Sequence, residues 1–148
     1  MKRAILSAAL AVAFVTGVFA QDTAKFAGKW KSDTSYNVYT ITVVGSRMTI
    51  TTTVAGNTSE PMEYMLDGTM VKKTSEGPNG PVESVRTSTW EGHVLVTTTK
   101  LSNGSVTVER RSLEPDGTMR VQNTLVLMQG KPAPPSAPTG VVVMKKIG

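Results

Sequence analysis

Short runs rich in Thr and Val, separated by turns that contain glycine, constrain this chain more than any other feature of its sequence. Both residues are β-branched, so they fit the pleated surface of a strand and lose side-chain freedom in a helix. No stretch places apolar residues at helical spacing over three turns. The pattern therefore predicts an all-β protein built from antiparallel hairpins.

The turn at Gly45-Ser46 fixes the register of the first hairpin. Glycine in the first position of a two-residue loop is typical of a type II′ turn, which pairs Ile41 with Ile50. Tyr39 and the other apolar residues of this hairpin then share one face, and threonines occupy the opposite face. One face should therefore point into a core and the other toward water.

Asp67-Gly68 has the composition of a type I′ turn and predicts another hairpin. In that register Tyr64 pairs with Val71 on one face, and Glu63 pairs with Lys72 on the other. Because the charged pair belongs in water, Tyr64 is expected to face inward.

Two further turns, Glu91-Gly92 and Asn103-Gly104, predict three long neighbouring strands. The first turn pairs Arg86 with Thr97, and the second pairs Thr97 with Arg110. A four-residue loop at the next turn continues the same face into the following strand, whereas a three-residue loop would reverse that strand. With the four-residue loop, the inner face carries these apolar residues: Trp90, Leu95, Leu101, Val106, Val108, Met119, Val121 and Leu125.

Arg86, Thr97 and Arg110 consequently form a row across the inner face. A buried guanidinium needs a counter-charge, and its planar fork of donors binds a carboxylate bidentately. The row therefore predicts a site for the acidic head of an amphipathic ligand, with Tyr39 and Tyr64 along its apolar part. Two alternatives stay open: the row is solvated at an open rim, or it pairs with an inward acidic residue, which this register does not supply.

Residues 130–140 read GKPAPPSAPTG, and their four prolines cannot donate to a β-ladder. We expect a stiff surface loop before the last strand; docking to an aromatic-lined groove of a partner is the alternative. The Val141–Val143 run then indicates a closing strand, either buried on both faces or completing a barrel. Nine or ten strands joined by tight turns predict an up-and-down β-barrel or a curled meander.

Residues 1–20 have the features of a secretory signal peptide. Lys2 and Arg3 precede an uncharged apolar run that ends at Val18-Phe19-Ala20. The expected mature chain, residues 21–148, has the size of one domain and contains no cysteine. The sequence therefore predicts an exported protein, periplasmic or extracellular, without a membrane span after cleavage.

Charge and side-chain chemistry argue against several functions. Removal of Lys2 and Arg3 lowers the net charge from +5 to +3, and the basic residues are spread along the chain, so nucleic-acid binding is not expected. His93 is the sole histidine, whereas a catalytic triad or a metal site needs convergent partners. Because no nucleophile motif and no cofactor motif is visible, the sequence predicts a protein that is not an enzyme.

Three features resemble the calycin group, which comprises lipocalins and fatty-acid-binding proteins. Gly28-Lys29-Trp30 matches the Gly-x-Trp opening of their first strand, antiparallel hairpins follow, and Val141–Ile147 resembles their closing strand with its basic residues. Small exported bacterial lipocalin-like domains are a more specific likeness, and the segments that carry it are Tyr64–Gly68, Trp90-Glu91-Gly92 and Pro115-Asp116-Gly117.

The resemblance implies a barrel in which Trp30 plugs the floor and a basic side chain of the last strand, Lys145 or Lys146, covers its ring. A lid of two helices, as in fatty-acid-binding proteins, has no room, because only Ser32–Ser35 is available for it. The expected function is binding of a small hydrophobic or amphipathic molecule. The alternative is a structural or protein-interaction domain without a ligand cavity, whose partner the sequence does not identify.

Overall fold

The structure is a computed structural model that describes residues 23–137 and 139–148. The signal peptide predicted for residues 1–20 lies outside the described residues. Within the described residues, no helix is long and apolar enough to cross a membrane. The described residues form these elements: η1, a 3-10 helix (Ala24–Phe26), β1 (Gly28–Ser32), β2 (Val38–Val44), β3 (Arg47–Val54), β4 (Asn57–Thr58), β5 (Met62–Met65), β6 (Val71–Gly77), β7 (Gly80–Glu91), β8 (Val94–Leu101), β9 (Val106–Leu113), β10 (Met119–Met128), β11 (Lys131–Pro132) and β12 (Thr139–Ile147).

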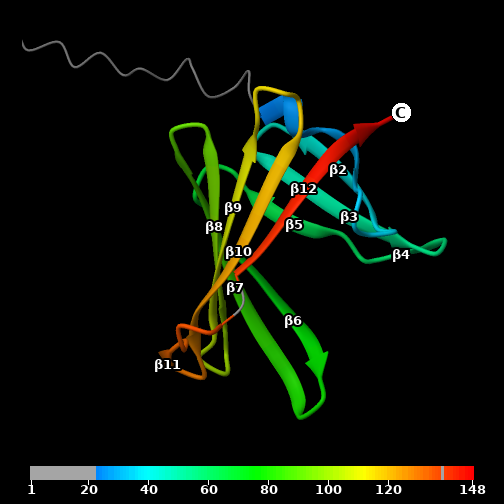
Figure 1. The fold of residues 1–148 in the computed structure, drawn as a ribbon. Coiled ribbons are helices and arrows are strands. Elements are labelled where there is room, and N and C mark those ends of the chain that lie inside the picture. Colours follow the sequence, from blue (N-terminus) through cyan, green and yellow to red (C-terminus); the bar gives the residue numbers. More distant parts are fainter. Residues whose placement is uncertain (1–22, 138) are drawn as a thin grey trace, which may run out of the picture.

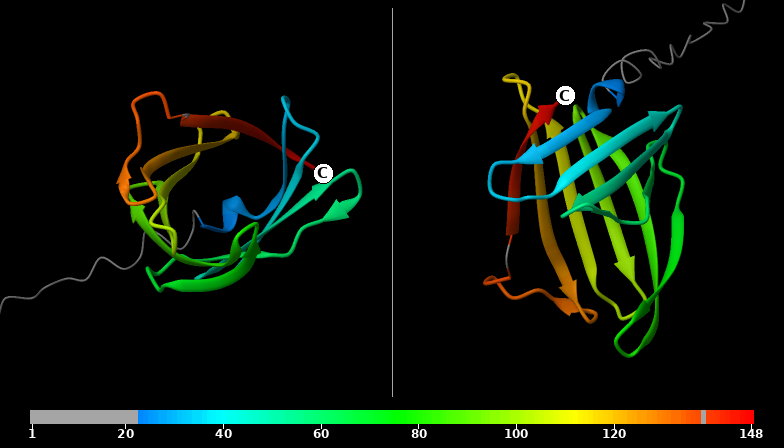
Figure 2. Two further views of the ribbon diagram at one scale, coloured as in Figure 1. Left: turned by 90° about the horizontal axis from the view of Figure 1, so that it is seen from below. Right: turned by 90° about the vertical axis from the view of Figure 1, so that its right-hand side faces the viewer.

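The strands belong to one antiparallel sheet that curls into a barrel (Figure 1, Figure 2). Hydrogen-bonded neighbours follow the order β4-β3-β2-β1-β12-β10-β9-β8-β7-β6, while β5 pairs with β3 and β11 pairs with β10. The predicted up-and-down meander is thus confirmed. Strands β4 and β11 have only two residues each, so the longer strands agree with the expected nine or ten.

The last strand joins the two ends of the meander. β12 pairs with β1 through Trp30 and Lys146, and with β10 through Met119 and Met144. The predicted closure is confirmed, but burial of the valine run on both faces is wrong. Val141 and Val143 are 46% and 50% exposed, because a strand in a single-layered barrel has only one inner face.

The hairpin predicted across Asp67-Gly68 does not form a ladder. β5 pairs with β3, and β6 pairs with β7, so the predicted pairs of Tyr64 with Val71 and of Glu63 with Lys72 are wrong. The carboxylate of Asp67 accepts a backbone N–H two residues further on at 3.0 Å, which satisfies the turn locally. A seam between β5 and β6 therefore interrupts the hydrogen-bonded sheet (Figure 1).

Two of the predicted turns keep every side chain on its expected face. Ile41 pairs with Ile50 as predicted, and Gly45 has a φ of 59°, as the first residue of a type II′ turn requires. At the later turn, Gly92 also takes the first loop position, so Glu91 pairs with Val94. This register differs from the prediction by two residues, and a shift of two preserves the faces of a strand.

The turn at Asn103-Gly104 contains one residue more than predicted. The N–H of Leu101 donates to the carbonyl of Ser105 at 2.9 Å, and the Leu101 carbonyl accepts the Gly104 N–H at 3.0 Å, which closes a three-residue loop. Gly104 has a φ of 83°, the left-handed conformation that such loops place third. Thr97 consequently lies opposite Glu109, and every β9 side chain points to the face opposite to the predicted one.

The strand after the next turn nevertheless has its predicted face. Its loop also has three residues, because the N–H of Glu114 donates to the carbonyl of Thr118 at 2.8 Å. This second one-residue change reverses the first, so β10 returns to the expected orientation. The prediction is right for Met119, Val121 and Leu125, which face inward, and wrong for Val106 and Val108, which face outward.

The proline-rich segment lies on the surface, as predicted, but it contributes a short strand. β11 pairs with the end of β10 through Pro132 and Leu127, and the N–H of Ala133 donates to the carbonyl of Val126 at 2.9 Å. The segment reaches a ladder because residues between its prolines keep their N–H groups. Residue 138 lies outside the described residues.

The apolar core fills the end of the barrel that holds Trp30. Its indole N–H donates to the carbonyl of Phe26 at 2.8 Å, and the Lys146 ammonium lies 5.4 Å from the ring centroid. Lys146 is thus the basic residue on the ring, whereas Lys145 pairs with Asp33 at 2.6 Å. The other buried core residues are Phe26, Ile41, Met48, Ile50, Tyr64, Leu66, Leu95, Met119, Val121 and Met144.

Gly28 gives the Gly-x-Trp opening a physical reason. Its φ is 130°, a conformation that L side chains rarely adopt, and a Cβ here would lie 2.5 Å from Cε of Lys146. The glycine therefore lets the lysine stem pass close to β1 and place its ammonium over Trp30.

The variant Gly28→Ala is expected to lower the free energy of unfolding by about 1–3 kcal/mol, because it adds backbone strain and displaces Lys146. Urea denaturation measures the change. Gly140→Ala is the matched control, since a Cβ at Gly140 meets nothing within 4 Å and its φ is outside the left-handed region. Equal stabilities of the two variants would contradict this account of Gly28.

Candidate ligand-binding site

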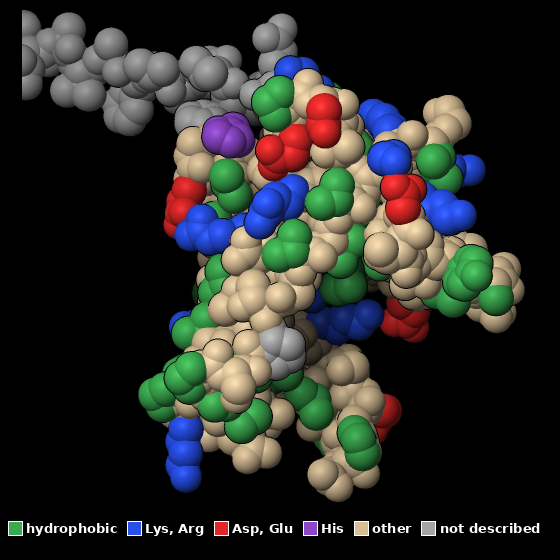
Figure 3. Space-filling view, in the orientation of Figure 1, with side chains coloured by type: hydrophobic (Ala, Val, Ile, Leu, Met, Phe, Trp, Pro, Cys, Tyr) green, Lys and Arg blue, Asp and Glu red, His purple; other side chains and the backbone are tan. Residues whose placement is uncertain are grey.

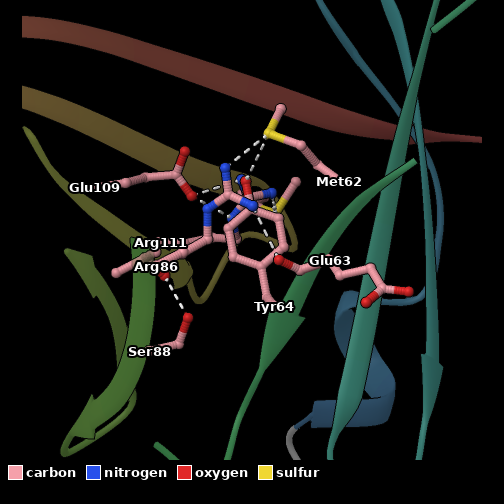
Figure 4. A network of polar contacts seen from close by, with 9 residues as sticks. Met62, Glu63, Tyr64, Arg86, Ser88, Glu109 and Arg111 are labelled. Carbon is pink, nitrogen blue, oxygen red and sulfur yellow. Dashed lines mark hydrogen bonds and ion pairs between the residues drawn. The ribbon is translucent and has the colours of Figure 1, made fainter. Parts of the chain in front are cut away.

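A group of polar side chains, the inner cluster, lies inside the barrel beside the apolar core (Figure 4). Alternation along β7, β8 and β9 turns these side chains inward, and β5 supplies the tyrosine that lies among them. The inner cluster consists of Tyr64, Arg86, Ser88, Thr97, Glu109 and Arg111.

Arg111 and Glu109 form a buried ion pair within β9. Nη2 and Nε of Arg111 donate to Oε1 of Glu109 at 2.8 and 3.3 Å, and the two side chains are 5% and 19% exposed. They are two residues apart on one strand, so they share the inner face. Because removal of a lone charge from water is costly, the carboxylate is the counter-charge that makes burial of Arg111 tolerable.

Arg86 has a different environment. Its Nη1 donates to the backbone carbonyl of Glu63 at 2.9 Å, its Nη2 contacts Sδ of Met62 at 3.2 Å, and its Cζ lies 4.7 Å from the centroid of the Tyr64 ring. Among the described residues, no carboxylate forms an ion pair with Arg86. The inner cluster thus holds two guanidinium groups and one carboxylate, which leaves an excess positive charge at Arg86, whose contacts are open to solvent.

Tyr64 stays neutral in this position. Burial raises the pKa of its phenol above the ordinary value of 10.0, and the carboxylate of Glu109 raises it further, while Arg111 and Arg86 oppose the shift. The hydroxyl donates weakly to Sδ of Met62 at 3.8 Å. The ring therefore offers the guanidinium groups a π-face, and the hydroxyl keeps its proton at neutral pH.

The inner cluster lies next to the seam between β5 and β6. The hydrogen bond from Arg86 to Glu63 crosses from β7 to β5, and an ion pair between Lys73 and Glu60 at 3.0 Å crosses the same gap. Side chains thus replace backbone ladder bonds at this place. The surface is hollowed between the β6–β7 hairpin and strands β3–β5, with Lys and Arg side chains in the hollow (Figure 3).

The barrel is less filled beyond the inner cluster than at Trp30. Thr99, Thr107 and Leu125 pair with one another on the inner face, yet each remains only half-buried. Gly140 lies on the same face by alternation with Met144, and a Cβ there would meet nothing within 4 Å. Arg86 therefore stands between a packed floor and an end of the barrel that admits solvent.

The structure brings together two of the predicted site residues, Arg86 and Tyr64. Thr97 faces inward as predicted, but it lies opposite Glu109 and its hydroxyl pairs with Ser88 at 2.9 Å. Tyr39 packs at the edge of the apolar core on β2, and its hydroxyl accepts a hydrogen bond from the side-chain amide of Asn37 at 3.4 Å.

The predicted inward position of Arg110 is wrong. Arg110 faces outward and forms an ion pair with Glu91 at 2.8 Å, in which both side chains are about half exposed. Its neighbours Glu109 and Arg111 occupy the inner face instead, and sequence reasoning missed both. The signal that could have found them is the third position of Gly104 in its loop, because a three-residue loop places the odd-numbered residues of β9 inside.

A separate pocket of about 510 Å³ lies at the outside of the barrel floor. It contains exposed His93, and neither Arg86 nor Arg111 lines it. In the described part of the chain, no three His, Cys, Asp or Glu residues are placed to hold a metal ion. The lining residues are Lys25, Phe26, Trp30, His93, Leu113, Glu114, Pro115, Gly117 and Lys146.

Glu109→Gln is expected to lower the free energy of unfolding by about 3–5 kcal/mol, because Arg111 is then buried without a counter-charge. Glu91→Gln is the matched control: it removes the exposed partner of Arg110 and should cost less than about 1 kcal/mol. Chemical denaturation of both variants at neutral pH measures the difference. Similar small losses would show that Arg111 does not depend on Glu109.

Stability should also fall in alkaline solution through Tyr64. Because the pKa of Tyr64 is raised in the folded protein, the unfolded chain loses this proton first, and stability decreases as the pH rises above about 10. Tyr64→Phe should make this decrease shallower, whereas Tyr36→Phe, at a side chain that is 91% exposed, should not. Urea denaturation at about pH 8 and pH 11 tests this, and parallel curves for the two variants would contradict it.

No protein-family model and no curated protein matches the chain significantly. Solved structures of similar shape include a variant of the fluorescent protein UnaG, with 16% identity and a TM-score of 0.60; the match covers 84% of this chain and 97% of that one. The REP1-NXSQ fatty acid transporter matches with 14% identity and a TM-score of 0.57, over 82% and 96% of the two chains.

Fatty-acid-binding protein 1 of Echinococcus granulosus matches with 15% identity and a TM-score of 0.58, over 84% of this chain and 98% of that one. Identities this low establish the fold and leave function to the residues of the site. The chain therefore has the calycin-type β-barrel fold that its Gly-x-Trp opening and its closing strand resemble.

Proposed function

We propose that this protein binds a small amphipathic molecule with an acidic head and that Arg86 holds the head. The observation that carries this proposal is an inward guanidinium without a carboxylate partner in the described chain. Arg111 already has its counter-charge in Glu109. A single additional negative charge would therefore balance the inner cluster.

The contacts of Arg86 leave a place for that charge. One nitrogen donates to a carbonyl, but the other contacts the thioether of Met62, and sulfur is a weak acceptor. A carboxylate oxygen in place of the sulfur would give a shorter, charge-assisted hydrogen bond. The exchange requires movement of the Met62 side chain only, and methionine adapts readily because it is unbranched.

The apolar part of the ligand would extend toward the less filled end of the barrel. The half-buried side chains of Leu101, Thr107 and Leu125 line that path on the inner face. A fatty acid transporter and a fatty-acid-binding protein share the fold, which favours a hydrophobic ligand in this barrel. We place the activity outside the cytoplasm, as an exported binding protein without enzymatic activity, because residues 1–20 have the composition of a signal peptide.

A fluorescent long-chain fatty acid and its methyl ester provide the test. The acid should bind the protein, and Arg86→Gln should weaken its binding about ten- to a hundredfold, as expected for loss of a charge-assisted hydrogen bond. Arg110→Gln is the matched control, because this outward arginine should leave binding unchanged. The ester should bind weakly to the unaltered protein and should be insensitive to Arg86→Gln.

Two results would refute parts of the proposal. Equal affinities for acid and ester, or equal effects of Arg86→Gln and Arg110→Gln, would show that Arg86 does not select an acidic head. Absence of binding, together with a native mass equal to that of the bare chain after incubation with a lipid extract, would favour the alternative of an interaction domain without a ligand.

A further inference from the structure

β6 offers an unpaired edge to its surroundings. It ends the order of paired strands, and on its other side the seam separates it from β5. The β6–β7 hairpin projects from the barrel, and no strand of the described chain pairs with the outer side of β6, beside which the Lys73–Glu60 ion pair crosses the seam at 3.0 Å (Figure 1). Such an edge is a template for another strand, because one of every two residues presents its N–H and C=O outward.

The hydrogen bonds of β7 identify the outward-pointing groups of β6. Glu83 donates its N–H to the hydroxyl of Ser102 at 3.1 Å and accepts the Ser102 N–H at 2.8 Å, so both of its backbone groups point away from β6. Its partner Thr74 is therefore in a pair without hydrogen bonds, and the N–H and C=O of Thr74 point to the open edge. By alternation, the same holds for Lys72 and Glu76.

This edge is complementary to itself. When two copies of β6 run antiparallel about Thr74, each Lys72 lies opposite Glu76 of the second copy, and the two threonines face each other. Neither Lys72 nor Glu76 has an ion-pair partner among the described residues, and both are exposed. Opposite charges and Thr–Thr pairs directly across an antiparallel ladder are both stabilising.

We propose that two copies of this chain associate through their β6 edges into a dimer with twofold symmetry. The backbone groups of Lys72, Thr74 and Glu76 form about six intermolecular hydrogen bonds in this arrangement. The two Lys72–Glu76 pairs set the register. This association is independent of the ligand proposed for the inner cluster.

Other registers of the same edge lose the charge pairing. A displacement by two residues brings Lys72 opposite Thr74 and leaves Glu76 without a partner in the strand. A larger displacement places Lys72 opposite its own copy, and like charges in that position are destabilising. Lysines commonly protect an edge strand from pairing, but in the proposed register each lysine meets a carboxylate.

A charge exchange tests the dimer. Sedimentation equilibrium of the purified protein up to about 1 mM should show a reversible mixture of single and double mass. Glu76→Lys should raise the dimer dissociation constant about tenfold or more. In the dimer of this variant, the new lysine of each copy faces Lys72 of the other copy, so two pairs of like charges form. The double variant Lys72→Glu with Glu76→Lys should restore association, because it exchanges the two partners and recreates both pairs.

Two more variants distinguish pairing through the β6 edge from a general effect of protein charge or of misfolding. Thr74→Pro removes the central N–H donor without touching the β6–β7 ladder, so it should abolish the dimer while circular dichroism stays that of the folded barrel. Glu91→Lys makes the same charge change on the far end of β7 and should leave association unchanged. A protein that stays monomeric at every concentration overturns the proposal; this is the result expected if the partner of β6 is a different extended peptide. A dimer that is insensitive to both Glu76→Lys and Thr74→Pro also overturns it.

Discussion

The contact between Trp30 and Lys146, a directly opposed pair in the β1–β12 ladder, joins the first strand of the barrel to the last. β12 arrives after the proline-rich segment and has to find β1, which lies more than a hundred residues earlier in the chain. Backbone bonds alone leave the register of two such strands free to slip. The indole buried under a lysine fixes one register, and Gly28 provides the space for the lysine stem. The floor of the barrel therefore stays closed while the opposite end can remain less filled.

Closure through β12 leaves the seam between β5 and β6 as the only gap in the order of paired strands within the described chain. Arg86 bridges that gap through its hydrogen bond to the carbonyl of Glu63, so one side chain serves both the barrel and the proposed ligand. The two roles are compatible, because the carbonyl occupies one guanidinium nitrogen and leaves the other on a weak sulfur acceptor. The same seam exposes the outer edge of β6, the edge at which we propose that two copies associate.

The sequence predicts the architecture well because alternation and turn composition are local signals. It predicts the site only in part, because the face of each side chain depends on counting loop residues. The loop at Gly104 has one residue more than predicted. Arg111 therefore lies on the inner face, where Arg110 was expected. The next loop has one residue fewer than predicted, which cancels the first difference, so the predicted inward face of Met119 is right although both loop lengths differ from the prediction. Local sequence could not predict that β5 and β6 fail to pair across Asp67-Gly68, because the composition of this turn favours a hairpin. The outcome depends on β3, which pairs with β5, and on β7, which pairs with β6.

The ion pair between Arg111 and Glu109 gives a physical reason for the ligand selectivity that we propose for the inner cluster. An apolar pair of similar shape would be at least as stabilising in a buried position, so stability gives no reason for its presence. With Arg111 neutralised by Glu109 and close to the same tyrosine ring as Arg86, the cluster presents one unbalanced positive charge and not two. A ligand with a single negative charge then leaves the interior neutral, whereas a doubly charged head would bring an unpaired charge into it. In the proposed function, the carboxylate of Glu109 thus sets the charge of the ligand that the barrel accepts, and Arg86 sets the position at which that charge is held.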